Sequence, residues 1–216
     1  MIAISSHRPF FDNPVYADNQ ERALKTWRDK FETIYYFGGY EESLNAPNVR
    51  FCRNDDGWPR IKQMVECASK MKSTYVAILN ADIVLTDGFV DVEAKMDGMA
   101  LPAATSYRYE FNPVDYPNLE NATRHREDRG MDIFIATPGI WKTVEKEIPD
   151  YLRVGHPTWD SWVCGFFCDH LGYGFRQFTE NRCVFHPKHL GRLTPHSPEI
   201  RNDSKYFTLA KRPSPL

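Results

Sequence analysis

Residues 75–85, YVAILNADIVL, are the stretch that decides how this chain folds. Residues 75–79 are aromatic, β-branched or aliphatic, and they predict a buried strand. The strand stops at Asn80-Ala81-Asp82, and a second apolar run follows at once over residues 83–85. A carboxylate between two buried strands is costly to desolvate unless it is paired or bound to a cation. Because ligands of open α/β sheets gather at the carboxyl ends of strands, Asp82 is a candidate for binding a metal or a phosphate. The alternative is a strand-end Asp that caps the next turn.

Length and composition place the chain among globular proteins. It has 216 residues, of which 42% are hydrophobic and 14% aromatic, enough to bury a sizeable core. The opening sequence MIAISSHRPF lacks the basic and apolar regions of a signal peptide, and no apolar run has the length of a membrane span. We therefore expect a cytoplasmic protein with no integral membrane segment.

The cysteines agree with a reducing compartment. Their number is odd and none are spaced as C-x-x-C, which argues against both a disulfide framework and a zinc knuckle. The five cysteines are Cys52, Cys67, Cys164, Cys168 and Cys183.

The net charge of -2 is unevenly distributed along the chain. Residues 176–216 carry eight Lys or Arg residues against three Asp or Glu residues. A basic end of this kind often binds an anionic partner, and a polyanion such as DNA is one candidate. A solvated tail without a partner explains the same charges, so both interpretations stay open.

The first half of the chain alternates strands and helices. Apolar residues at helical spacing, with Asp18 or Asn19 as the cap, predict a helix over residues 18–31. Pro59 in the first turn begins a second helix over residues 59–72. Strands are predicted over residues 2–5, 33–37, 48–52 and 75–80. This alternation predicts a mostly parallel sheet covered by helices.

The second half is less regular. Strands are predicted over residues 99–105, 131–137 and 178–185, and an apolar helix over residues 158–171. Residues 106–130 are polar and aromatic with no clear period, as in a functional lid. Pro, Ser and charged residues beyond Leu193 predict a peripheral arm. We therefore expect one domain over residues 1–193 and an arm over residues 194–216.

Four short motifs occur in an order that resembles a known enzyme family. Asn80-Ala81-Asp82 resembles a D-x-D motif with Asn in place of the first Asp, and Gly130-Met131-Asp132 resembles a Gly-containing acceptor loop. Trp159-Asp160 resembles a catalytic-base motif whose first residue is usually Glu, and His186 resembles a late metal-binding His. In this order the motifs resemble the GT-A fold glycosyltransferases of the family-2 type, in the nucleotide-diphospho-sugar transferase superfamily. The resemblance covers about residues 1–190.

The resemblance implies a fold and an activity. The fold would be α/β, a single GT-A-like (Rossmann-like) domain whose central, mostly parallel sheet is flanked by helices. Residues 1–85 would form the nucleotide-binding half and residues 86–193 the acceptor half. The enzyme would transfer a sugar from a nucleotide-sugar donor, with a UDP-sugar as the first choice, to a hydroxyl of a saccharide or small acceptor.

The resemblance also implies a divalent cation held by Asp82 and His186. Breaking a sugar–diphosphate bond builds negative charge on the leaving nucleotide, and a cation offsets that charge as a Lewis acid. Carboxylate oxygen suits Mg²⁺ or Mn²⁺, and an imidazole favours Mn²⁺. His189 is the alternative to His186. The neutral Asn80 is expected to contact the ribose or a metal-bound water.

Asp160 is the candidate catalytic base. Residues 156–160 place it near a helix N-terminus, where the helix dipole stabilises a carboxylate. A base there would take the proton of the acceptor hydroxyl, and direct displacement would invert the anomeric carbon. The alternative is an Asp that only caps its helix. Gly130, Asp132 and Trp159 are expected to contact the acceptor.

The donor nucleotide is expected on the N-terminal half. In the family, the loop after the first strand and the start of the helix before the D-x-D motif hold the base and phosphates. Arginines and helix N-termini favour such anions. The corresponding residues here are Ser5, His7, Arg8, Gly39, Tyr40, Asp56, Arg60 and Asn80. Arg8 and Arg60 are equally explained as ordinary surface residues.

Three rival functions stay open. A nucleotidyltransferase shares the sheet architecture, but the sequence SSHRPFFDNP lacks the Gly-rich loop expected after its first strand. A non-catalytic nucleotide- or carbohydrate-binding module of the same fold is allowed by Asn80. The third is a phage-type DNA glycosyltransferase that acts on flipped-out hydroxymethylated bases, although residues 106–130 are themselves slightly acidic.

Overall fold

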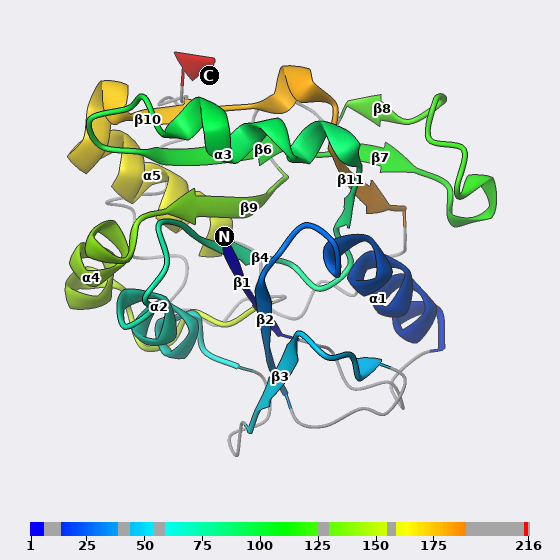
Figure 1. Ribbon diagram of the computed structural model, residues 1–216, viewed down its shortest axis with the longest axis horizontal. Coiled ribbons are helices and arrows are strands. Elements are labelled where there is room, and N and C mark those ends of the chain that lie inside the picture. The colour runs from blue at the N-terminus through cyan, green and yellow to red at the C-terminus, as the bar shows by residue number, and fades with distance from the viewer. Residues whose placement is uncertain are drawn as a thin grey trace.

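The computed structural model has helices on both sides of a central sheet (Figure 1). It describes residues 1–6, 14–38, 44–53, 59–124, 130–154 and 159–188, together with the backbone of residues 214–215. The longer helices are α1 (Pro14–Trp27), α2 (Ile61–Ser69), α3 (Asp91–Met96), α4 (Pro138–Glu147) and α5 (Trp159–Leu171). The strands are β1 (Ile2–Ser6), β2 (Thr33–Phe37), β3 (Val49–Cys52), β4 (Val76–Leu79), β5 (Val84–Leu85), β6 (Ala103–Tyr107), β7 (Tyr109–Phe111), β8 (Thr123–Arg124), β9 (Met131–Ala136), β10 (Phe175–Gln177), β11 (Val184–Pro187) and β12 (Ser214–Pro215).

The central sheet confirms the α/β class predicted from the sequence. Within the described residues it has eight strands, in the order β12-β10-β6-β9-β4-β1-β2-β3. Figure 1 shows them following one another from β10 near the top of the view to β3 at the bottom. β1 pairs in parallel with β2 and β4, whereas β9 runs antiparallel to β4 and β6. The sheet is therefore mostly parallel, and β9 is inserted against the common direction.

Large apolar side chains fill both faces of the sheet. α2, α4 and α5 cover one face, where Trp141, Trp162 and Phe167 are fully buried. α1 and α3 cover the other face, where Leu24 and Trp27 are fully buried. Burying a side chain of this size contributes on the order of 2 kcal/mol to folding. The strands between the two layers are mostly apolar, as expected of a sheet covered on both faces, and their buried polar residues include Ser5, Thr105 and Asp132.

A second, smaller sheet adjoins the carboxyl end of β4. Its order is β5-β11-β7-β8. β5 follows β4 after residues 80–83, and β6 of the central sheet leads through Arg108 into β7 of the small sheet. β11 runs antiparallel to β5 and parallel to β7. The two sheets therefore meet at the turn that carries Asn80 and Asp82.

Several element boundaries differ from the sequence prediction. α1 begins at Pro14, so Asp18 and Asn19 lie inside the helix, and neither caps it. The strand predicted over residues 99–105 begins only at Ala103. The strand predicted over residues 178–185 begins only at Val184, because a short 3-10 turn occupies Thr179–Asn181.

The segment predicted as a long lid contains regular structure. Within residues 106–130, β7 and β8 pair antiparallel at the edge of the small sheet. The sequence prediction also missed α3, α4 and β10. A local signal for α4 was present, because Thr137 caps the helix by accepting a hydrogen bond from Ile140 N (3.3 Å) and Pro138 follows it.

The described helices and the C-terminal end complete the fold. In the part of the chain that the structure describes, no helix is long and apolar enough to cross a membrane. Of the arm predicted over residues 194–216, only the backbone of residues 214–215 is described, where β12 pairs in parallel with β10. The predicted boundary near Leu193 lies outside the described residues.

Candidate functional site

The turn after β4 is held in place from three directions. Asn80 N donates to Asp132 O (2.9 Å), Ser5 Oγ donates to Leu79 O (2.7 Å), and Trp27 Nε1 donates to Ile83 O (2.6 Å). Central strands and the helix that packs on them thus fix the backbone on both sides of Asp82. A side chain on such a turn is positioned more accurately than one on a long loop.

Asp82 and His186 lie side by side at this edge. His186 Nε2 is 3.3 Å from Asp82 Oδ2, and the two side chains are 10% and 19% exposed. The pairing of β11 with β5 brings them together, because Phe185 lies opposite Val84 in the antiparallel register. Two of the residues expected to bind metal are therefore neighbours, although more than a hundred positions separate them in the sequence.

Tyr36 is a buried tyrosine on which the charge of Asp82 acts. It lies on β2 and its side chain is fully buried. Burial, and next the negative charge of Asp82, raise the pKa of the Tyr36 phenol well above its ordinary value. Tyr36 therefore stays a neutral hydroxyl close enough to feel the Asp82 charge.

The Asp82–His186 pair fits two positions of a divalent-cation site. Two ligands at about 2.1 Å on adjacent positions of an octahedral ion lie about 3 Å apart, close to the 3.3 Å between Oδ2 and Nε2. Among the described residues, no group of three or more His, Cys, Asp or Glu side chains is arranged to hold a metal. The pair thus suits an open site that a substrate oxygen or water completes, rather than a closed structural site.

A second carboxylate, Asp132, lies on the other side of Asn80. It is the second residue of β9 and its side chain is 4% exposed. Asn80 Nδ2 donates to Asp132 Oδ1 (2.6 Å), and Arg108 Nη1 donates to Asp132 Oδ2 (2.7 Å). Arg108 Nη2 also donates to Glu110 Oε1 (3.2 Å). Together these four side chains form a polar cluster between the two sheets, here called the Asp132 cluster.

Asp160 lies in the first turn of α5, within electrostatic reach of Asp132. Its Oδ1 accepts a hydrogen bond from the backbone N–H of Ser161 (2.8 Å). Burial is the first cause, and the negative charge of Asp132 the second, that raise the pKa of Asp160 to about 6; Arg108 and the Ser161 N–H act in the opposite direction. A carboxyl group with this pKa is ionised at neutral pH and is a stronger base than an exposed Asp.

The packing of Trp159 fixes the start of α5. Trp159 is 3% exposed, and its ring meets that of Phe134 edge to face at a centroid distance of 5.6 Å. Trp159 was expected to contact the acceptor, but its side chain lies in the core. Its contribution to the site is to hold Asp160 against β9.

Other predicted residues have structural contacts. Gly130 has a φ of +82°, a conformation that glycine adopts without strain, and its carbonyl accepts from Arg108 N (3.1 Å). Ser5 is fully buried and donates to β4, so its side chain supports the turn from below. Both residues are buried, and their contacts stabilise the site.

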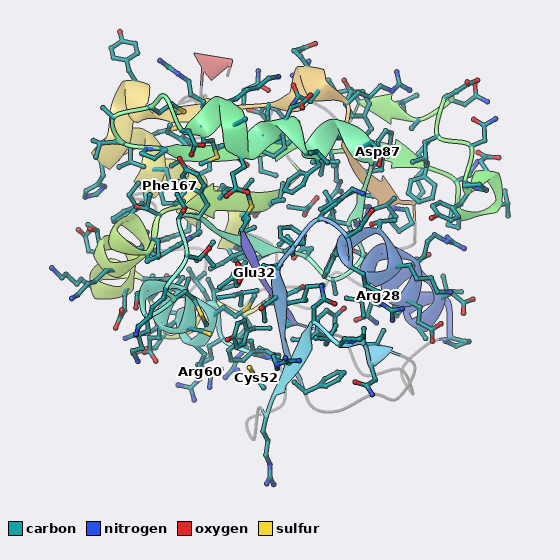
Figure 2. All side chains as sticks on the ribbon, in the orientation of Figure 1. Arg28, Glu32, Cys52, Arg60, Asp87 and Phe167 are labelled. Carbon is teal, nitrogen blue, oxygen red and sulfur yellow. The ribbon has the colours of Figure 1, made fainter. Side chains whose placement is uncertain are left out.

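Arg60 is not brought to the Asp82–His186 pair. It precedes α2, and its backbone N–H donates to Gln63 Oε1 (3.1 Å). Figure 2 shows Arg60 at the lower left of the molecule, next to α2, whereas β11 lies at the upper right of Figure 1. Any contact between Arg60 and a nucleotide would therefore involve a part of the ligand distant from the metal pair.

The remaining predicted nucleotide and metal residues lie outside the described part of the chain. These are His7, Arg8, Gly39, Tyr40 and Asp56, together with the alternative metal ligand His189. Three site residues that the sequence prediction did not name are Arg108, Glu110 and Tyr36. Glu110 lies opposite His186 in the register of β7 and β11, which only the fold reveals.

Comparisons with known proteins identify the fold. No family model matches the chain, and no curated protein matches it. A Bacillus anthracis protein assigned as a glucose-1-phosphate thymidylyltransferase, in complex with sucrose, aligns with TM-score 0.54 at 7% identity, over 83% of this chain and 87% of its own. S. aureus TarS 1-349 aligns with TM-score 0.56 at 10% identity, over 86% of this chain and 60% of its own.

These similarities show a shared fold. The chain spans less than two thirds of TarS 1-349. Both neighbours thus share the α/β fold predicted from the sequence, in which helices flank a mostly parallel central sheet. At identities this low the fold does not distinguish sugar transfer from nucleotidyl transfer. That distinction depends on the chemistry of the site.

Proposed function

We propose that this protein is a metal-dependent glycosyltransferase, which moves a sugar from a nucleotide-sugar donor to an acceptor hydroxyl with inversion. The observation that carries the proposal is the Asp82–His186 pair, with Oδ2 and Nε2 3.3 Å apart. Asn80, two residues before Asp82, donates a hydrogen bond to Asp132, and the charge of Asp132 acts on Asp160. A pair suited to hold a cation at a strand end, and a carboxylate of raised pKa at the start of α5, are the two groups that this transfer requires.

Asp82 and His186 would hold the cation, either Mn²⁺ or Mg²⁺. When bound, it supplies a positive charge that offsets the charge of the leaving nucleoside diphosphate. The rigid turn after β4 would hold Asp82 in place during the reaction. Asn80 donates its Nδ2 to Asp132, and its Oδ1, which has no hydrogen-bond partner among the described residues, would be available to the ribose or a metal-bound water.

Asp160 would act as the general base. The acceptor hydroxyl gives its proton to the Asp160 carboxylate while its oxygen bonds to the anomeric carbon. The bond from that carbon to the diphosphate oxygen breaks, and its electron pair leaves with the nucleoside diphosphate. A single displacement of this kind inverts the configuration at the anomeric carbon.

The donor and the acceptor are proposed by class. A UDP-sugar is the first donor to test, and a saccharide or small hydroxyl compound the first acceptor. The basic residues expected to bind DNA, from Arg192 onward, lie outside the described part of the chain. Within the described part, Arg182 donates to the carbonyls of Leu119, Glu120 and Ala122, which is a structural role.

Product analysis separates the proposed enzyme from its rivals. The protein would be incubated with a panel of nucleotide-sugars, with Mn²⁺ or EDTA, and nucleoside diphosphate release would be measured. Release that needs Mn²⁺ and is lost in Asp82→Ala, but not in the control Asp87→Ala at an exposed position, supports the proposal. Pyrophosphate release from a nucleoside triphosphate and a sugar phosphate would instead identify a nucleotidyltransferase. Binding without either reaction would identify a binding module.

A further inference from the structure

A pocket lies between α1 and the loop that joins β7 to β8, outside the site described above. Its volume is about 240 Å³. Four of its five lining side chains come from α1, and the fifth comes from the loop. Figure 1 shows α1 below β7 and β11 at the right of the view. This pocket, here called the α1 pocket, is lined by Asp18, Glu21, Arg22, Lys25 and Tyr116.

The aromatic wall of the α1 pocket is held by two neighbours. The Arg22 guanidinium lies over the Tyr116 ring, 4.7 Å from its centroid. Arg22 Nη1 also donates to Oδ1 of Asn19 (3.4 Å), a side chain that is only 1% exposed. The Phe111 ring lies 6.2 Å from that of Tyr116, at an angle of 39°. Tyr116 is nevertheless partly exposed, and it lines the pocket with a side chain that is both apolar and hydrogen-bonding.

The charged wall of the α1 pocket is not used up by ion pairs along the helix. Asp18 lies four residues before Arg22. Glu21 lies four residues before Lys25, and at this spacing opposite charges on a helix attract each other. Among the described residues, however, neither carboxylate forms an ion pair, and Arg22 makes the two contacts given above. The carboxylates therefore line the pocket as acceptors that a ligand can use.

The balance of these groups selects a neutral ligand with many hydroxyl groups. Two carboxylates and two cations cancel, so the pocket lacks the surplus of positive charge that a polyanion such as DNA requires. A sugar hydroxyl both donates to a carboxylate and accepts from a Lys or Arg N–H, as the hydroxyl of Ser does. The Tyr116 ring offers apolar surface to the C–H groups of the same sugar. Since drug-sized ligands occupy about 300–1,000 Å³, this smaller pocket suits a single sugar ring.

Both walls of the α1 pocket continue into the elements that carry the proposed metal pair. On the loop side, Tyr116 packs on Phe111, which lies opposite Pro187 in the register of β7 and β11. Pro187 directly follows His186 on β11. On the helix side, Thr26 Oγ1 accepts from a backbone N–H of β5 (3.0 Å), the strand that pairs with β11. The pocket therefore adjoins the proposed reaction site.

We propose that the α1 pocket binds one sugar ring of a saccharide acceptor, and that it does so without the donor or the cation. The acidic side chains accept from the sugar hydroxyls, the basic ones donate to them, and the Tyr116 ring packs on the C–H groups. Calling this saccharide the acceptor rests on the proposed function, whereas its binding to the pocket does not depend on any reaction.

Ligand-observed NMR on the metal-free protein tests the proposal. The probes are neutral mono- and trisaccharides of glucose, galactose, mannose and N-acetylglucosamine at millimolar concentration, with a short DNA duplex in a separate arm. We expect saturable binding of at least one saccharide, and an affinity that salt changes little because the ligand is uncharged. Tyr116→Ala should weaken this binding by about tenfold, since an aromatic contact is lost. The matched control is Tyr173→Ala, which removes a ring that is 86% exposed outside the pocket and should leave the affinity unchanged.

A second variant keeps the test valid if Tyr116→Ala does not fold. Glu21→Gln alters only one charge on the pocket side of α1, and it should weaken saccharide binding about fivefold, because a charged acceptor is replaced by a neutral one. Thermal unfolding identifies the folded variants. Binding of no saccharide in the panel would overturn the proposal. Saccharide binding that the folded pocket variants leave unchanged, or DNA binding that they weaken, would overturn it as well.

The same variants separate this proposal from the proposed function. If a saccharide binds and the pocket variants weaken it, but no nucleotide-sugar is turned over, the α1 pocket stands as a saccharide site and the proposed function fails. If turnover occurs and Tyr116→Ala changes neither saccharide binding nor the KM for the acceptor, the saccharide site fails and the proposed function stands.

Discussion

Asp82 and Asp132 are two carboxylates on opposite sides of Asn80, and their environments differ. Asp82 is 19% exposed and faces an imidazole, whereas Asp132 is 4% exposed and accepts from an amide and a guanidinium. Asp132 already has a cationic partner within the protein, the Arg108 guanidinium. The partner of Asp82, the imidazole of His186, is itself a good metal ligand. One edge of the sheet thus carries one carboxylate suited to bind a cation from solution and another that pairs with Arg108 inside the protein.

The comparison teaches that position at a strand end does not by itself define a metal ligand. Both residues follow or begin a central strand near the same turn. The residue that pairs with each carboxylate separates their roles, since Arg108 occupies the place beside Asp132 that a metal would need. The predictions below test this division, beginning with the largest expected effect.

Replacing the proposed base, Asp160, is expected to cause the largest loss of transfer activity. Asp160→Asn keeps the size of the side chain and can still accept from the Ser161 N–H, but it cannot take a proton. Transfer should fall by about a hundredfold or more, while nucleotide affinity stays nearly unchanged. Turnover and nucleotide binding measured on the same preparation check this. A folded Asp160→Asn protein with normal turnover, or a product that retains the donor configuration, would remove Asp160 from the role of base.

The free energy of unfolding should depend more on the buried pair of Arg108 and Asp132 than on an ion pair at the surface. Arg108→Ala leaves Asp132 charged and buried without its main partner, and it should lower the free energy of unfolding by about 3 kcal/mol. The matched control is Lys62→Ala, which breaks the surface pair of Lys62 and Asp150 (2.8 Å) and should lower the free energy of unfolding far less. Urea unfolding compares the two. Equal losses would show that the Asp132 cluster is no more constrained than the surface.

The raised pKa of Asp160 makes a signed prediction about pH. Its folded pKa of about 6 lies above the ordinary value of 3.8, so folding is disfavoured by its ionisation. This destabilisation is absent below about pH 4 and complete above about pH 6. Asp160→Asn should therefore gain on the order of 1–3 kcal/mol in free energy of unfolding, relative to the unmodified protein, between pH 4 and pH 8. A gain that does not depend on pH would mean that Asp160 has an ordinary pKa.

The sequence predicted the features that depend on local patterns. The apolar run before Asn80 identified β4 and the turn with Asp82, and helical spacing identified α2 and α5. The resemblance led to the prediction that Asp82 and His186 lie together, and the structure places them 3.3 Å apart. Arg108 was not identified because it lies in a segment without a period, and its contact with Asp132 depends on how β6 crosses between two sheets. The burial of Trp159 had a local sign that the prediction did not use, because apolar residues recur at i+3, i+4, i+7 and i+8 from it and form the buried face of α5.

The most direct test of the central claim is whether Asp82 couples metal to nucleotide. Thermal unfolding would be followed with UDP in Mn²⁺ and in EDTA for the unmodified protein, Asp82→Ala and the control Asp87→Ala. A ligand at a hundred times its dissociation constant stabilises by about 2.7 kcal/mol, or about 5 °C or more for a chain of this size. We predict that UDP raises the melting temperature by this amount only with Mn²⁺, and that Asp82→Ala abolishes the difference while Asp87→Ala retains it. An unchanged metal-dependent shift in Asp82→Ala would contradict the account, because Asp82 would then not be a ligand.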